Sequence, residues 1–232
     1  HDLLANDEVV RRVRAWDLAS TLPSEQNADP DYCAGVLIAK LKSGRYLIED
    51  LVHGRWRVGE LEQMLVEQSR KDFSDFCSTI SSTIFFRQPA EKWSIAQNVS
   101  HLITSANMTR LAYRLPKFMV RIYAGKPNRP SRSYDELVTK YQLKLQQGGR
   151  ASGRFVAKPV DEIAGKEKVL DSFNKSMEIL ICTINNKWKD SQLDQYLAPH
   201  PLLGKLTLRE LCYFTIYHTE HHLHIIKERL ND

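Results

Sequence analysis

Two histidines near the end of the chain, His218 and His222, are the residues best suited to chemistry. They lie in residues 206–230, where apolar residues recur at three- and four-residue steps, as on one face of an amphipathic helix. Thr207 and Glu210 form a capping-box pattern at the start of this helix. Two imidazoles one helical turn apart on the inward face can bind one metal ion from the same side. The sequence therefore predicts a metal site that needs further ligands from elsewhere.

The other polar residues around this pair are assigned no role in the site. His221 and His224 lie off the face that carries the pair, which predicts surface or hydrogen-bonded side chains. His200 directly precedes Pro201 and is expected to be a surface or packing residue. Glu220 lies between the paired histidines in sequence but points elsewhere, and the chain has no HExxH motif. No general base can be named, so the catalytic residues stay unknown.

Four long segments have the apolar spacing of helices and would have to position the site. They are residues 58–84, 94–115, 166–187 and 206–230. Ser94 and Gln97 form a second capping-box pattern. One long connection, about 125–165, carries a short helix at 134–145, and its glycines suggest a lid over the site. Four long helices with one long crossover predict a four-helix bundle.

The N-terminal part has the pattern of β structure. Residues 13–20, 33–41 and 45–54 are candidate strands, and Lys42-Ser43-Gly44 is a turn signal between the last two. The predicted fold class is therefore α+β, mainly α: a four-helix bundle with a small N-terminal three-stranded antiparallel β appendage.

Composition narrows the possible partners. The chain has 232 residues, 42% of them hydrophobic, and a net charge of +5. Its Lys and Arg residues are scattered, which argues against nucleic acid as a partner. No apolar run approaches the ~20 residues of a membrane span, and the N-terminal segment is too polar for a signal peptide. Four widely spaced cysteines indicate no disulfide framework. We therefore expect a cytoplasmic protein that does not enter a membrane.

Several segments resemble the DinB-like superfamily of metal-binding four-helix bundles. The matching motifs are KWSIAQNVSHL (92–102), SGRFVAKP (152–159), HPLLGKLTLREL (200–211) and YHTEHHLHII (217–226). The resemblance covers about Glu67 to Asp232. It implies that His101, His218 and His222 are metal ligands, with water or substrate completing the coordination.

A three-His site with an open position is typical of catalytic rather than structural zinc, although nickel, iron and manganese also accept imidazole. The resemblance implies a divalent metal, most often zinc or nickel. It also implies a hydrolase or a thiol-dependent transferase that acts on a small molecule. DinB-like bundles often dimerise, and the predicted sheet has exposed edges, so we expect a homodimer.

The N-terminal residues resemble another family, the RNase H-like nuclease domain of phage terminase large subunits. The similarity covers about residues 9–70, and Asp17 matches the first catalytic carboxylate of that family. The segments that would supply the remaining carboxylates are absent, and one carboxylate cannot bind two metal ions, which argues against a nuclease. We therefore expect a fusion of a truncated segment, 1–66, with a bundle, 67–232, that share the helix at 58–84. A chimeric protein without catalytic activity is the alternative to the enzyme.

Overall fold

A computed structural model describes residues 9–17, 33–54, 58–90 and 92–231. The chain forms two compact units, residues 1–60 and 61–232, each described here by itself. The described residues are mainly helical and include a small three-stranded antiparallel sheet near the N-terminus. The predicted α+β, mainly α class is confirmed.

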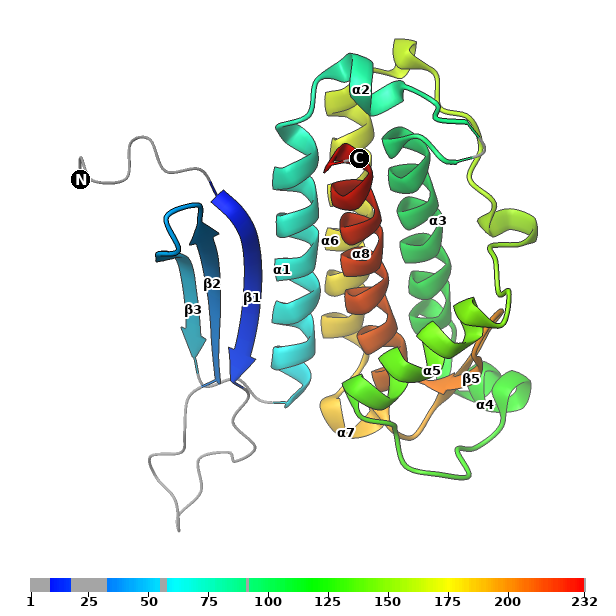
Figure 1. Ribbon diagram of the computed structural model, residues 1–232. Coiled ribbons are helices and arrows are strands. Elements are labelled where there is room, and N and C mark those ends of the chain that lie inside the picture. Colours follow the sequence, from blue (N-terminus) through cyan, green and yellow to red (C-terminus); the bar gives the residue numbers. More distant parts are fainter. Residues whose placement is uncertain (1–8, 18–32, 55–57, 91, 232) are drawn as a thin grey trace. The chain divides into compact units, whose positions relative to one another are not determined.

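The N-terminal sheet has the simplest antiparallel order, β1-β2-β3 (Figure 1). Its strands are β1 (Val9–Asp17), β2 (Cys33–Leu41) and β3 (Tyr46–Gly54). Gly44 has φ = +84° in the predicted turn, a conformation that glycine adopts without strain. The backbone N–H of Leu41 donates to the carbonyl of Arg45 at 2.9 Å and closes this turn. The first strand starts earlier than predicted, and its expected end at 18–20 lies outside the described residues.

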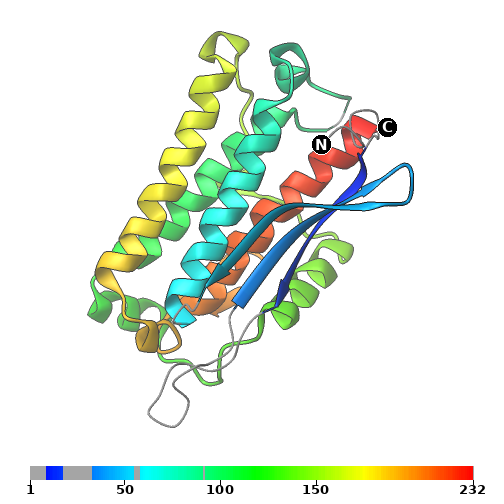
Figure 2. The same cartoon turned by 90° about the vertical axis from the view of Figure 1, so that its left-hand side faces the viewer.

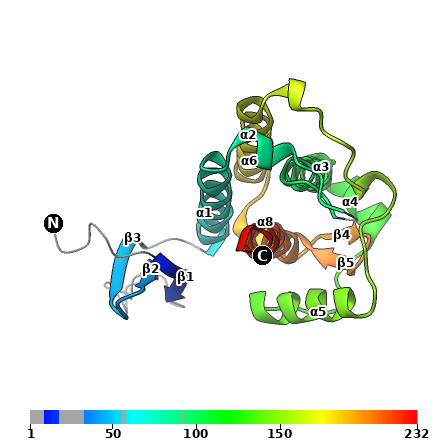
Figure 3. The same ribbon diagram turned by 45° about the horizontal axis from the view of Figure 1, so that its top comes forward.

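Four long helices form the bundle (Figures 1 and 2). Viewed toward the helix ends, α1 and α3 lie at opposite corners, and each neighbours both α6 and α8 (Figure 3). The rings of Phe73 on α1 and Phe173 on α6 pack with centroids 5.0 Å apart, and neither side chain is exposed. The four helices are α1 (Val58–Ser78), α3 (Ile95–Arg114), α6 (Lys166–Lys187) and α8 (Leu208–Asn231).

The single helix expected over 58–84 is wrong in its extent. The helix is unbroken through residues 67–72 but ends at Ser78, and a separate short helix, α2 (Ser82–Phe86), follows. The hydroxyls of Ser78 and Thr79 donate to carbonyls three residues earlier, at 2.7 and 2.8 Å. Such side-chain bonds compete with continuation of the helix, and Ser81 then caps α2. The apolar spacing alone did not reveal this break.

The connections between the long helices contain further elements. Helix α5 lies beside α8 (Figure 3) and packs against it, with the rings of Tyr141 and Phe214 5.5 Å apart between centroids. No helix in the described part of the chain is long and apolar enough to cross a bilayer. The elements are α4 (Lys117–Ala124), α5 (Tyr134–Gln146), η2 (Gly153–Phe155), η3 (Glu162–Ala164), α7 (Asp190–Leu193), β4 (Leu197–His200) and β5 (Gly204–Thr207).

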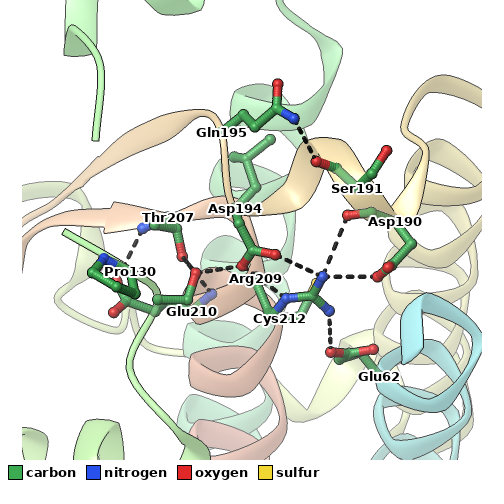
Figure 4. Close-up of polar contacts among 12 residues, drawn as sticks. Glu62, Pro130, Asp190, Ser191, Asp194, Gln195, Thr207, Arg209, Glu210 and Cys212 are labelled. Carbon is green, nitrogen blue, oxygen red and sulfur yellow. Dashed lines mark hydrogen bonds and ion pairs between the residues drawn. The ribbon is translucent and has the colours of Figure 1, made fainter. Parts of the chain in front are cut away.

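A buried cation joins the first turns of α8 to α1 and α7 (Figure 4). The Arg209 side chain is 9% exposed and donates to Glu62 at 2.5 Å. It also donates to Asp190 at 2.8 Å, and to both carboxylate oxygens of Asp194 at 2.8 and 2.9 Å. Burial raises the pKa of the Glu62 carboxyl, while the Arg209 charge opposes that shift. One guanidinium therefore neutralises carboxylates from two other elements.

The capping box predicted at the start of α8 is present and has a second use. The Glu210 backbone N–H donates to the Thr207 hydroxyl at 3.2 Å, and the Thr207 N–H donates to the Glu210 carboxylate at 3.0 Å. The same buried carboxylate receives two hydrogen bonds from Arg129, at 2.6 and 2.9 Å. The cap of α8 thus also fixes the loop before α5.

Candidate metal centre

The structure brings together three histidines that are far apart in the sequence. His101 lies in the second turn of α3, and His218 and His222 lie one turn apart on α8. The Nε2 atom of His218 is 3.0 Å from Nε2 of His101 and 3.2 Å from Nε2 of His222. Ligand atoms of the three rings all lie within 4.8 Å of one another. Each side chain is buried, with 5–6% of the residue exposed.

Hydrogen bonds at the outer nitrogens fix the direction of two rings. His101 Nδ1–H donates to the carbonyl of Phe155 at 2.7 Å, because a carbonyl oxygen can only accept. His222 Nδ1–H donates to Oδ1 of Asn98 at 2.7 Å. The Asn98 amide is itself oriented, since its Nδ2 donates to the Ser94 carbonyl at 2.8 Å. In a metal-bound histidine, the hydrogen bond donated by one ring nitrogen normally fixes the tautomer and leaves the other nitrogen free to bind. Here both rings turn an Nε2 lone pair toward His218.

This donor set fits a divalent cation. Tetrahedral zinc with bonds of about 2.0–2.1 Å separates its nitrogen ligands by roughly 3.3 Å. The two Nε2 separations at His218, 3.0 and 3.2 Å, are close to that value. One proton on His218 can form a good hydrogen bond to only one neighbouring lone pair, whereas a cation can accept all three lone pairs.

Burial also keeps these rings in the form that binds metal. It lowers the pKa of His101, and it lowers the pKa values of His218 and His222 well below the ordinary histidine value. Neutral imidazole is the form that coordinates a cation. Trp93 stacks parallel to His222, and Phe214 stacks against His218 with centroids 4.8 Å apart. These aromatic contacts further restrict the rings.

A cavity of about 530 Å³ opens beside the cluster, and His101 and His218 form part of its wall. The rest of the wall is mainly apolar and comes from α3, α5, the segment 150–155, the β4–β5 hairpin and α8. Phe155, whose carbonyl binds His101, also lines the cavity. The long connection therefore contacts the site, as the lid hypothesis requires, although closure itself stays a prediction.

Comparison with known families agrees with this geometry. The sequence profile described as the DinB superfamily matches residues 65–226, more than half of the chain. The chain belongs to the DinB superfamily. The matched segment contains all three clustered histidines, the whole of α3, and α8 up to residue 226. No curated protein matches the chain. The match does not include β1–β3, so the terminase-like resemblance of residues 9–70 stays a prediction.

The remaining polar candidates lie outside the DinB histidine cluster. His221 packs against Tyr217, and His224 pairs with Glu228 at 3.0 Å, in line with their expected places off the ligand face. Glu220 accepts a hydrogen bond from Tyr134 at 2.7 Å and is not part of the cluster.

The predictions for Asp17, in the N-terminal sheet, and His200, in the β4–β5 hairpin, have different outcomes. Asp17 is the last residue of β1 and pairs with Ala34, but its side chain lies outside what the structure describes. His200, expected at the surface or in packing, packs against Phe214 and also lines the cavity. The sequence around His200 did not indicate the cavity, because α3 and α5 come close to His200 only in the folded chain.

Asn98 is a functional residue that helix spacing did not reveal. Asn98→Ala removes the acceptor for His222 Nδ1–H, so the ring loses its fixed tautomer and orientation. We expect zinc affinity to fall by about tenfold to a hundredfold, as is usual for partners of metal-bound histidines. Competition with a chromophoric chelator measures this change. Asn98→Asp keeps an acceptor oxygen for His222 but loses the bond to the Ser94 carbonyl, so it tests whether the acceptor alone maintains the affinity. Equal affinities for the wild type and Asn98→Ala would show that Asn98 does not orient a ligand.

Proposed function

We propose that this DinB-superfamily chain is a divalent-metal-dependent enzyme whose substrate binds in the cavity beside the three histidines. The observation that carries the proposal is the cluster of three buried histidines beside the cavity. Two of them, His101 and His218, form part of the cavity wall. His101, His218 and His222 would hold the cation. When bound, it would lower the pKa of a coordinating water or thiol and so supply a nucleophile at neutral pH. Zinc and nickel are the favoured metals, because a nitrogen-ligand site generally binds both more tightly than it binds iron or manganese.

The cavity wall favours thiol-dependent transfer over hydrolysis. The described residues that line the cavity include neither Asp nor Glu, so they offer no carboxylate to deprotonate a water. They include no cysteine either. Cys77 and Cys212 are buried, and burial raises the pKa of both thiols to about 12. A thiol nucleophile would therefore be a small molecule, and the chain would supply the binding site and exclude water from it.

Two assays separate the transferase from the hydrolase. In the first, protein loaded with zinc or nickel is given cysteine and 1-chloro-2,4-dinitrobenzene. The thiolate sulfur forms a bond to the ring carbon, and chloride leaves with the bonding electrons. In the second, the same protein is given 4-nitrophenyl acetate without thiol. We expect metal-dependent conjugation that is lost in His101→Ala, and little ester hydrolysis.

The opposite pattern would favour the hydrolase. Metal-dependent ester cleavage without thiol-dependent conjugation would show that water is the nucleophile. Equal rates with metal-loaded and metal-free protein in both assays would contradict the enzymatic proposal and favour a fold with an inherited metal site.

A further inference from the structure

His200, at the end of β4, is held in one tautomer by the backbone of its own hairpin. Its Nδ1 atom accepts hydrogen bonds from the N–H groups of Leu202 and Leu203, at 3.2 and 3.1 Å. A ring nitrogen that accepts a hydrogen bond carries no proton. The proton of neutral His200 must therefore be on Nε2, and this ring nitrogen is a hydrogen-bond donor.

The residue that carries this donor lines the cavity. The His200 ring lies 4.2 Å from the Phe214 ring, and Phe214 in turn stacks on His218, with centroids 4.8 Å apart. All three residues line the cavity. Among the described residues, Nε2 of His200 has no hydrogen-bond acceptor. Burial, helped by the nearby charge of Lys140, lowers the pKa of His200 to about 4, so the ring is neutral at pH 7.

The surroundings indicate what this donor can bind. A neutral N–H in a mainly apolar wall favours an uncharged acceptor oxygen, because an anion would lose its hydration without gaining a compensating charge there. The charged lining residues, Arg150 and Arg154, are exposed and already bonded within the chain: Arg150 donates to the carbonyls of Leu145 and Gly149, and Arg154 donates to the Met108 sulfur. On α3, the hydroxyls of Ser105 and Thr109 also line the cavity and can donate hydrogen bonds.

We propose that His200 is a ligand-binding residue whose Nε2–H holds the carbonyl oxygen of an apolar substrate in the cavity. The inference rests on the proposed function in taking this cavity as the substrate site, but the hydrogen bond needs no metal. The bond can therefore be tested on metal-free protein. A failure of the metal chemistry and a failure of this contact then give different results.

The hairpin offers a matched pair of substitutions. In His200→Asn the amide oxygen can take the place of Nδ1 and keep the two backbone bonds, but nothing replaces Nε2–H. In His200→Gln the amide nitrogen can take the place of Nε2, while the backbone bonds are lost. The Asn variant should therefore stay folded and lose the ligand contact, and the Gln variant should lose some thermal stability and keep the contact.

Binding is measured with two fluorescent probes that differ only by a carbonyl-containing group. These are 6-propionyl-2-(dimethylamino)naphthalene and 2-(dimethylamino)naphthalene, titrated into chelator-treated protein. We expect His200→Asn to weaken binding of the carbonyl probe by roughly threefold to tenfold, the range for one neutral hydrogen bond. The emission of the carbonyl probe bound to His200→Asn should also lie to the blue of its emission when bound to the wild type. The probe without a carbonyl should bind the wild type and both variants equally.

Three results would overturn the proposal. One is equal affinity of the carbonyl probe for wild type and His200→Asn. Another is an equal loss of both probes, which would indicate a change in cavity shape. The third is failure of the wild-type protein to bind the carbonyl probe. Independently, long-range ¹H–¹⁵N correlation spectra should show His200 protonated at Nε2 at pH 7, and protonation at Nδ1 would also overturn the proposal.

Discussion

His218→Ala is expected to leave the protein without a stoichiometric divalent ion. His218 is the central ligand, because its Nε2 lies 3.0 and 3.2 Å from the other two Nε2 atoms. Alanine leaves His101 and His222 on different helices with no ring between them. We expect about one zinc per wild-type chain and almost none in the variant, with affinity reduced by at least a hundredfold. Elemental analysis after dialysis against trace zinc measures the difference.

A matched control lies on the same helix. His221→Ala removes an imidazole of similar helical context that is not part of the cluster. It should keep its zinc, so loss of metal in both variants would indicate damage to α8 rather than removal of a ligand. Retention of a full zinc equivalent by His218→Ala, with the protein folded, would contradict the three-histidine centre.

Replacing Arg209 with methionine is expected to cost about 3–5 kcal/mol of the free energy of unfolding, the usual cost of breaking a buried ion pair. The substitution leaves the Glu62 side chain, only 3% exposed, without its cation. It also releases Asp190 and Asp194 of the α7 region from α8 (Figure 4). Urea denaturation followed by circular dichroism gives the difference. Zinc content of the folded variant should not change, because His218 lies roughly 13 Å further along the helix.

Two further variants isolate the buried charge as the cause. Arg70→Met removes another helix arginine whose acidic partners, Glu67 and Glu178, are about half exposed, so it should cost no more than about 1 kcal/mol. Combining Arg209→Met with Glu62→Leu removes the stranded carboxylate and should recover much of the loss. If the double variant is less stable than Arg209→Met alone, the cost comes from lost packing and not from the unpaired charge.

The parts of this fold that local chemistry determines were predictable from the sequence. The apolar spacing of α8 and the Thr207–Glu210 capping box are encoded within a few residues, and both are present. The same holds for α3, with its Ser94–Gln97 cap, and for the glycine turn between β2 and β3. The pairing of His218 with His222 also follows from helix periodicity. The place of His101 beside them required the family resemblance, because no local pattern relates α3 to α8.

Most of the rest depends on contacts between distant segments. The end of α1 is an exception, because the hydroxyls of Ser78 and Thr79 bond carbonyls only three residues earlier, which apolar spacing does not register. Asn98 gains its role only because the packing of α3 against α8 places it opposite His222. His200 faces a cavity whose wall comes from five parts of the chain. Such roles belong to the assembled fold, so helix and strand periodicity does not encode them.

X-ray absorption spectroscopy of the zinc-loaded protein tests the metal centre most directly. The account predicts three imidazole nitrogens at about 2.0–2.1 Å and one further light atom from water or buffer. The multiple-scattering signal of the imidazole rings should correspond to three rings per zinc and fall in His101→Ala. A spectrum with sulfur ligands, or with fewer than two imidazoles per zinc, would contradict a centre built from His101, His218 and His222.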